Sequence, residues 1–100
     1  MPSSSEKEVY FRLRGRVQGV GFRRWAVKTA RDIGGISGWV RNNATGDVEI
    51  LARGYVPRIE MIIELCRRGP MLARVDELEF IGGRLSGFLP PIEDGVFEQI

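Results

Sequence analysis

The residues from Gly15 to Arg23 have the types and spacing needed to hold an anion. The segment reads Gly-Arg-Val-Gln-Gly-Val-Gly-Phe-Arg, and its three glycines let the backbone turn tightly and point N–H groups inward. We expect a helix to begin directly after the last glycine, which directs the positive end of its dipole at the same space. Arg23 adds a planar guanidinium that can grip a phosphate through two parallel hydrogen bonds. The segment therefore predicts a small phosphate site.

A second candidate is Asn42, at the end of the segment Gly38-Trp39-Val40-Arg41-Asn42. Asparagine is common next to turns, where its side chain bonds nearby backbone groups. The functional interpretation is that the Asn42 amide faces the anion site and positions a water molecule. Spacing along the chain leaves both interpretations open.

Three better-known anion motifs are absent from the chain. The GxxxxGK(S/T) loop of nucleotide-binding proteins is missing, because no lysine follows the glycines. The glycine spacing and distal acidic residue of the dinucleotide fingerprint are also missing. A phosphatase with a cysteine nucleophile would need an arginine six residues after Cys66, and that position is Leu72.

The hydrophobic pattern predicts the elements that must position these residues. Val9, Phe11 and Leu13 alternate with Tyr10 and two arginines, which indicates a strand with one buried face. Helical spacing indicates helices over 22–33, ended by two glycines, and from 57 to the Gly-Pro pair at 69–70, with Cys66 on the inner face. Further strands are expected over about 36–42, 48–52, 73–81 and 96–100, with a turn at 43–46.

This order, β-α-β-β-α-β with a short last strand, predicts an α+β ferredoxin-like sandwich. Right-handed crossovers place both helices on one face of an antiparallel sheet. Residues 1–6 are polar and serine-rich and are expected to form a disordered tail, and residues 7–100 are expected to form a single domain. Residues 82–95 make a long connection, interpreted as a surface insertion, with a lid or docking loop as the other reading.

Two segments of the chain resemble both signatures of the acylphosphatase family. They are residues 13–23, Leu-Arg-Gly-Arg-Val-Gln-Gly-Val-Gly-Phe-Arg, and residues 38–54, which begin Gly-Trp-Val-Arg-Asn-Asn. The resemblance implies the same sandwich fold, and it implies hydrolysis of acyl phosphates without a cofactor or a metal. It implies that Arg23 binds phosphate and that Asn42 orients the attacking water. The phosphate cradle is then the backbone of Arg16, Val17, Gln18, Gly19, Val20 and Gly21.

Acyl phosphate hydrolysis suits a chain with no histidine and one cysteine. The carboxylate of a mixed anhydride is a good leaving group, so positioning and charge stabilisation do most of the work. The family's substrate is a small acyl phosphate, and we expect inorganic phosphate or sulfate to occupy the same site.

Composition limits the remaining possibilities. With 43% hydrophobic and 28% charged residues, the chain is typical of a soluble globular domain, and no apolar run is long enough to span a membrane. The net charge is +2, with +4 (9 basic, 5 acidic residues) in residues 1–50 and −2 (6 basic, 8 acidic) in residues 51–100. A lone cysteine allows no internal disulfide, so we expect a cytoplasmic protein. We also expect the protein to be a monomer.

Two other functions remain possible at this point. One is a ferredoxin-like module that binds an anion and never turns it over. The other is RNA binding through the sheet, which requires exposed aromatic residues on the third strand. Residues 47–53 contain none, so no nucleic acid partner is expected. Trp25, Trp39 and Cys66 are interpreted as packing residues.

Overall fold

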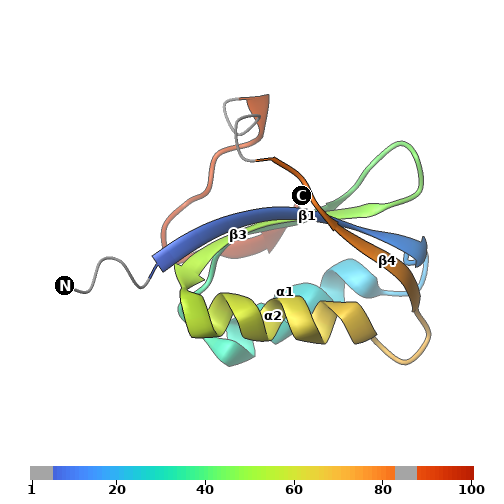
Figure 1. The fold of residues 1–100 in the computed structure, drawn as a ribbon, viewed down its shortest axis with the longest axis horizontal. Coiled ribbons are helices and arrows are strands. Elements are labelled where there is room, and N and C mark those ends of the chain that lie inside the picture. Colours follow the sequence, from blue (N-terminus) through green and yellow to red (C-terminus); the bar gives the residue numbers. More distant parts are fainter. Residues whose placement is uncertain (1–5, 83–87) are drawn as a thin grey trace.

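The computed structural model describes residues 6–82 and 88–100, which form two helices lying against one face of a sheet of five strands (Figure 1). Residues 1–5 of the predicted tail and residues 83–87 of the predicted insertion lie outside the described residues. In chain order the elements are β1 (Glu6–Arg16), α1 (Phe22–Ile33), β2 (Ser37–Asn42), β3 (Val48–Tyr55), α2 (Val56–Arg68), β4 (Arg74–Phe80) and β5 (Phe97–Gln99).

The strand order is β4-β1-β3-β2-β5, which confirms the predicted ferredoxin-like sandwich. Strands β1 and β3 are central neighbours, and every pair among the first four strands is antiparallel. The pairing of the short last strand was left open by the sequence, and in the structure β5 runs parallel to β2 at the sheet edge. The chain leaves β4 at one edge and returns to the other, where the free edge of β2 accepts it. There the Gly38 N–H donates to the Val96 carbonyl at 2.8 Å, and the Ile100 N–H donates to the Val40 carbonyl at 3.0 Å.

Both helices form where the apolar spacing predicts them. Helix α1 buries Phe22, Ala26 and Ala30, and it ends where the Gly34 N–H donates to the Ala30 carbonyl at 3.0 Å. Helix α2 has a proline in its first turn and ends at Gly69. Its buried stripe is the predicted one, namely Ile59, Ile62, Ile63 and Cys66.

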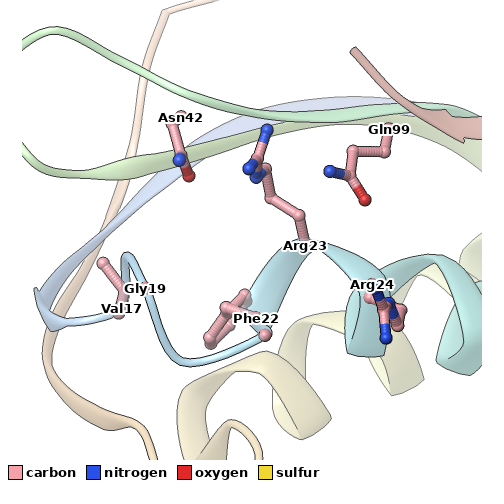
Figure 2. A pocket seen from close by; sticks show the side chains of 8 residues that line it. Val17, Gly19, Phe22, Arg23, Arg24, Asn42 and Gln99 are labelled. Atoms are coloured by element: carbon pink, nitrogen blue, oxygen red, sulfur yellow. The ribbon is translucent and has the colours of Figure 1, made fainter.

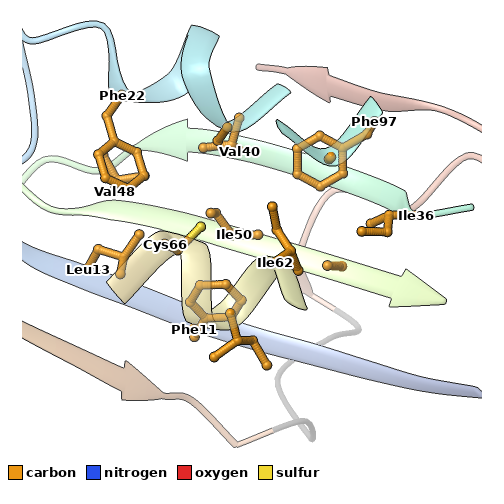
Figure 3. Packing of buried hydrophobic residues seen from close by; sticks show 14 of the residues in the cluster. Phe11, Leu13, Phe22, Ile36, Val40, Val48, Ile50, Ile62, Cys66 and Phe97 are labelled. Atoms are coloured by element: carbon orange, nitrogen blue, oxygen red, sulfur yellow. The ribbon is translucent and has the colours of Figure 1, made fainter. Parts of the chain in front are cut away.

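The main core lies between the helices and the sheet (Figure 3). Phe11 and Leu13 of β1 meet Val48 and Ile50 of β3 from the sheet side, all fully buried. Burying one side chain of this kind stabilises the fold by about 1.5–3 kcal/mol. The core therefore fixes α1 against the sheet, and with it the loop that precedes α1.

The opposite face of the sheet is also partly covered. Tyr10, Trp39 and Leu51 form a second buried cluster, against which Leu89 and Ile92 pack. The indole N–H of Trp39 donates to the Pro90 carbonyl at 2.9 Å. The prediction of a single buried face on β1 is therefore wrong at Tyr10. The described part of the 82–95 connection covers this face of the sheet. It therefore contributes to a buried cluster, which a surface insertion alone would not do.

Candidate active site

The loop between β1 and α1 adopts a backbone conformation that favours glycine. Gly19 and Gly21 have φ values of +75° and +79°, in the left-handed region that other residues rarely enter. Gly21 is also the N-cap of α1, and no side chain caps this helix end. The first intrahelical bond runs from the Trp25 N–H to the Gly21 carbonyl at 3.0 Å, so the N–H groups of the preceding first turn have no partner within the helix. This helix end is suited to an anion.

The structure brings Arg23 and Asn42 to one cavity of about 280 Å³ (Figure 2). Arg23 is the second residue of α1, and Asn42 is the last residue of β2, where it pairs with Val48 of β3. The Arg23 side chain rises from the helix toward the sheet, and the Asn42 amide points down toward the loop. The cavity is lined by Val17, Gly19, Gly21, Phe22, Arg23, Arg24, Asn42 and Gln99.

The side-chain oxygen of Asn42 is buried and has no hydrogen-bond partner among residues 6–82 and 88–100. A buried acceptor of this kind costs about 1–3 kcal/mol unless a donor reaches it. The oxygen belongs to a residue that lines the cavity, so a donor inside the cavity, such as a water O–H, can satisfy it.

The cavity is electropositive. Two arginines line it, together with no acidic side chain. Within the described part of the chain, neither Arg23 nor Arg24 forms an ion pair. Uncompensated guanidinium groups beside an open helix N-terminus favour a negatively charged ligand.

Of the six predicted cradle residues, three line the cavity, namely Val17, Gly19 and Gly21. Arg16, Gln18 and Val20 are not among its lining residues. The Gln18 side chain lies elsewhere: its Nε2 donates to the Asn43 carbonyl at 3.1 Å and to the Asp47 carbonyl at 2.9 Å. It ties the loop to the β2–β3 turn, directly beside Asn42.

The β2–β3 turn is braced on the other face of the sheet by Glu49. One Glu49 oxygen accepts from Tyr10 Oη and from Arg41 Nε, both at 2.9 Å, and the other accepts from Asn43 Nδ2 at 3.0 Å. Burial raises the pKa of Glu49, but these hydrogen bonds outweigh it and leave the pKa below its ordinary value. Asn43 Oδ1 in turn accepts from the Thr45 and Asp47 N–H groups at 3.0 and 2.9 Å, which fixes the turn.

The sequence interpretation missed three cavity residues: Phe22, Arg24 and Gln99. Gln99 reaches the site because β5 pairs with β2 and places it opposite Val40. Its signal in the sequence is weak, since a single polar residue in a short last strand has many uses. Arg24 follows Arg23 directly in the sequence, but this position alone does not show that the Arg24 side chain also faces the cavity.

Comparison with known proteins decides the family. The model of the acylphosphatase family matches residues 9–88. The chain belongs to the acylphosphatase family. It is 52% identical over 66 residues to an acylphosphatase of Acidiphilium cryptum. The aligned residues cover 66% of this chain and 71% of that relative. This family assignment makes the chain a hydrolase that acts on acid anhydrides.

Solved acylphosphatase structures have the same fold. The acylphosphatase of Coxiella burnetii superimposes with a TM-score of 0.78 at 30% identity, covering 98% of this chain and 96% of the other. That of Bacillus subtilis gives 0.77 at 29% identity, covering 93% and 97%. Among the described residues of this acylphosphatase, no three His, Cys, Asp or Glu side chains gather where they could hold a metal ion. None of its described helices has the length and apolar character needed to cross a membrane.

Proposed function

We propose that this acylphosphatase cleaves the carboxyl–phosphate anhydride of small acyl phosphates by direct attack of water. In the proposal Asn42 orients the water, and Arg23 with the loop amides holds the phosphoryl group. The supporting observation is that one electropositive cavity is lined by the glycine loop, the Arg23 side chain and the Asn42 amide.

The phosphoryl group would lie against the loop and the first turn of α1. Backbone N–H groups there, and the guanidinium of Arg23, donate hydrogen bonds to its non-bridging oxygens. Charge grows on these oxygens as the anhydride bond stretches, so fixed donors stabilise the transition state more than the bound substrate. Arg16, Gln18 and Val20 contribute to this cradle through their backbone.

The water would be held by the Asn42 amide, whose Oδ1 accepts a hydrogen bond from one of the water's O–H groups. Its oxygen forms the new bond to phosphorus while the bond between phosphorus and the carboxylate oxygen breaks. The electron pair of the broken bond leaves with the carboxylate. The water's proton passes to a phosphoryl oxygen, so the products are a carboxylate and inorganic phosphate, and neither a protein base nor a metal is required.

Two substitutions test the roles separately, with benzoyl phosphate as substrate. Arg23→Lys keeps the positive charge but loses the planar guanidinium that donates two parallel hydrogen bonds. We expect kcat/KM to fall at least ~10²–10³-fold, as for the loss of one oxyanion donor. Asn42→Ala should lower kcat to a similar extent and leave inhibition by phosphate in place. Arg53→Lys is the matched control and should be fully active, because Arg53 lies opposite Ser37, at the other end of the β2–β3 pair from Asn42.

The outcomes separate enzyme from binding module. Hydrolysis of benzoyl phosphate in EDTA, with no hydrolysis of a phosphate monoester, supports the proposal. Phosphate binding without any turnover would instead favour the non-catalytic module. Loss of phosphate binding in Asn42→Ala would remove Asn42 from the water-orienting role. The proposal also includes competitive inhibition by inorganic phosphate or sulfate, a monomer in solution and a cytoplasmic location.

A further inference from the structure

A second cavity of about 440 Å³ adjoins the first one along α1. The two cavities share Arg24 and Gln99 as lining residues. The other residues that line the second cavity are Val27, Lys28, Arg31 and Asp32, all on α1. We call this second cavity the side groove.

The side groove lies on the side of the first cavity where the proposed mechanism sends the leaving group. In an in-line displacement the leaving oxygen departs on the side of the phosphorus opposite the attacking water. Figure 2 shows Asn42 on one side of the Arg23 guanidinium, and Gln99 and Arg24 on the other. A water held at Asn42 therefore sends the carboxylate toward Gln99 and Arg24, where the side groove begins.

The side groove is positively charged. Its α1 residues follow at intervals of three and four, so they share one side of the helix. Lys28 is neutralised by Asp32, because its Nζ lies 2.8 Å from Asp32 Oδ2. Arg24 and Arg31 form no ion pair with any described residue. Two arginines thus remain available to a ligand, about 10 Å apart along the helix axis at 1.5 Å per residue.

We propose that the side groove binds the acyl part of the substrate and favours acyl phosphates whose acyl part carries a second negative charge. Arg24 meets the departing carboxylate and Arg31 meets the distal anionic group. Val27 contacts the carbon skeleton between them. This inference rests on the proposed function, because it takes the phosphate position and the attack direction from it.

The test compares two substrates, benzoyl phosphate and its 4-carboxylate derivative. The measured quantity is the ratio of kcat/KM for the charged compound to kcat/KM for the neutral one. At low salt this ratio should fall about two- to fivefold in Arg31→Gln, the usual strength of one exposed charge pair, and further in Arg31→Glu. Added salt should reduce the wild-type ratio and barely change that of Arg31→Gln. Arg68→Gln removes the same charge away from the groove and should keep the wild-type ratio.

A binding measurement without turnover accompanies the kinetics. In titration calorimetry, the wild type should bind the 4-carboxylate derivative of benzylphosphonate more tightly than benzylphosphonate itself. Arg31→Gln should lose this preference to the same extent as in the kinetics. If both substrates are hydrolysed and the ratio is equal in wild type, Arg31→Gln and Arg31→Glu, the proposed role of the side groove is wrong. The proposed function would remain intact. A ratio that falls equally in Arg68→Gln would also overturn it, since the effect would then be one of net charge. No hydrolysis of either compound would overturn the proposed function, and this inference with it.

Discussion

Substitution of Gln18 tests how the glycine loop is held at a fixed distance from Asn42. The Gln18 amide donates to two carbonyls of the β2–β3 turn, at 3.1 and 2.9 Å. Each such bond contributes about 0.5–1.5 kcal/mol, so Gln18→Met, which keeps the length and loses the donors, should lower the free energy of unfolding by roughly 1–3 kcal/mol. Gln18→Glu should cost more, because it places a carboxylate against two carbonyl oxygens.

Activity should fall along with stability in these variants. The loop carries the proposed phosphate cradle and the turn adjoins Asn42, so loosening their connection misplaces the water relative to the phosphorus. A misplacement of about 1 Å can cost ~10²-fold in rate, and we expect kcat to fall about 10- to 100-fold in Gln18→Met. Inhibition by phosphate should change little, because the loop itself is intact.

Urea unfolding followed by tryptophan fluorescence gives the stability, and benzoyl phosphate hydrolysis gives kcat. Gln18→Met matching the wild type in both would refute the bracing role. Gln18→Glu being as stable as Gln18→Met would refute the hydrogen-bond assignment. If kcat and phosphate binding fall equally, Gln18 shapes the phosphate cradle itself. It would then not act by setting the distance between the cradle and Asn42.

Three other parts of the structure give expected outcomes. Because the folded-state pKa of Glu49 is lowered, its stabilisation is present at neutral pH and is lost as the pH falls through that pKa. The stability difference between wild type and Glu49→Gln should therefore shrink below about pH 4.3, the ordinary Glu value. Burial raises the pKa of the Cys66 thiol, so a thiol reagent at pH 8 should react only with protein unfolded in urea. Gly21→Ala should cost roughly 1–2 kcal/mol of stability through its positive φ alone, since an added Cβ meets nothing within 4 Å.

A Glu49→Gln difference that stays constant from pH 7 to pH 3 would refute the role of the charged carboxylate. Rapid thiol reaction in native buffer would mean that α2 opens far more readily than its packing indicates. Gly82→Ala, which has open space and no positive φ, is the matched control for Gly21→Ala, and equal stability of the two would exclude strain.

Local chemistry made most of the fold predictable from the sequence. The buried stripe of α2 follows from its apolar spacing, and both helix ends follow from glycine and proline. Tyr10 was misjudged because alternation within one strand says nothing of a distant segment that covers the second face. Leu89 and Ile92 supply that cover from about 80 residues further along the chain. The parallel pairing of β5 could not be predicted, because edge pairing depends on where a long connection returns.

The candidate site was predictable only in part. The glycine spacing pointed to the loop and to Arg23 beside it, Asn42 was a candidate with two interpretations, and the family resemblance supplied a role for each. Their approach to one cavity depends on the sheet order, which places the end of β2 over the start of α1. The Gln18 side chain could not be placed from spacing, because its partners are backbone carbonyls with no sequence signature. Gln99 is a site residue only through the position of β5.

A crystal structure with phosphate bound tests the central claim most directly. We expect one phosphate ion held by N–H groups of residues 16–21 and by the Arg23 guanidinium, with a water on the Asn42 amide facing the phosphorus. Phosphate bound elsewhere, or an Arg23 or Asn42 side chain turned away from the ion, would contradict it.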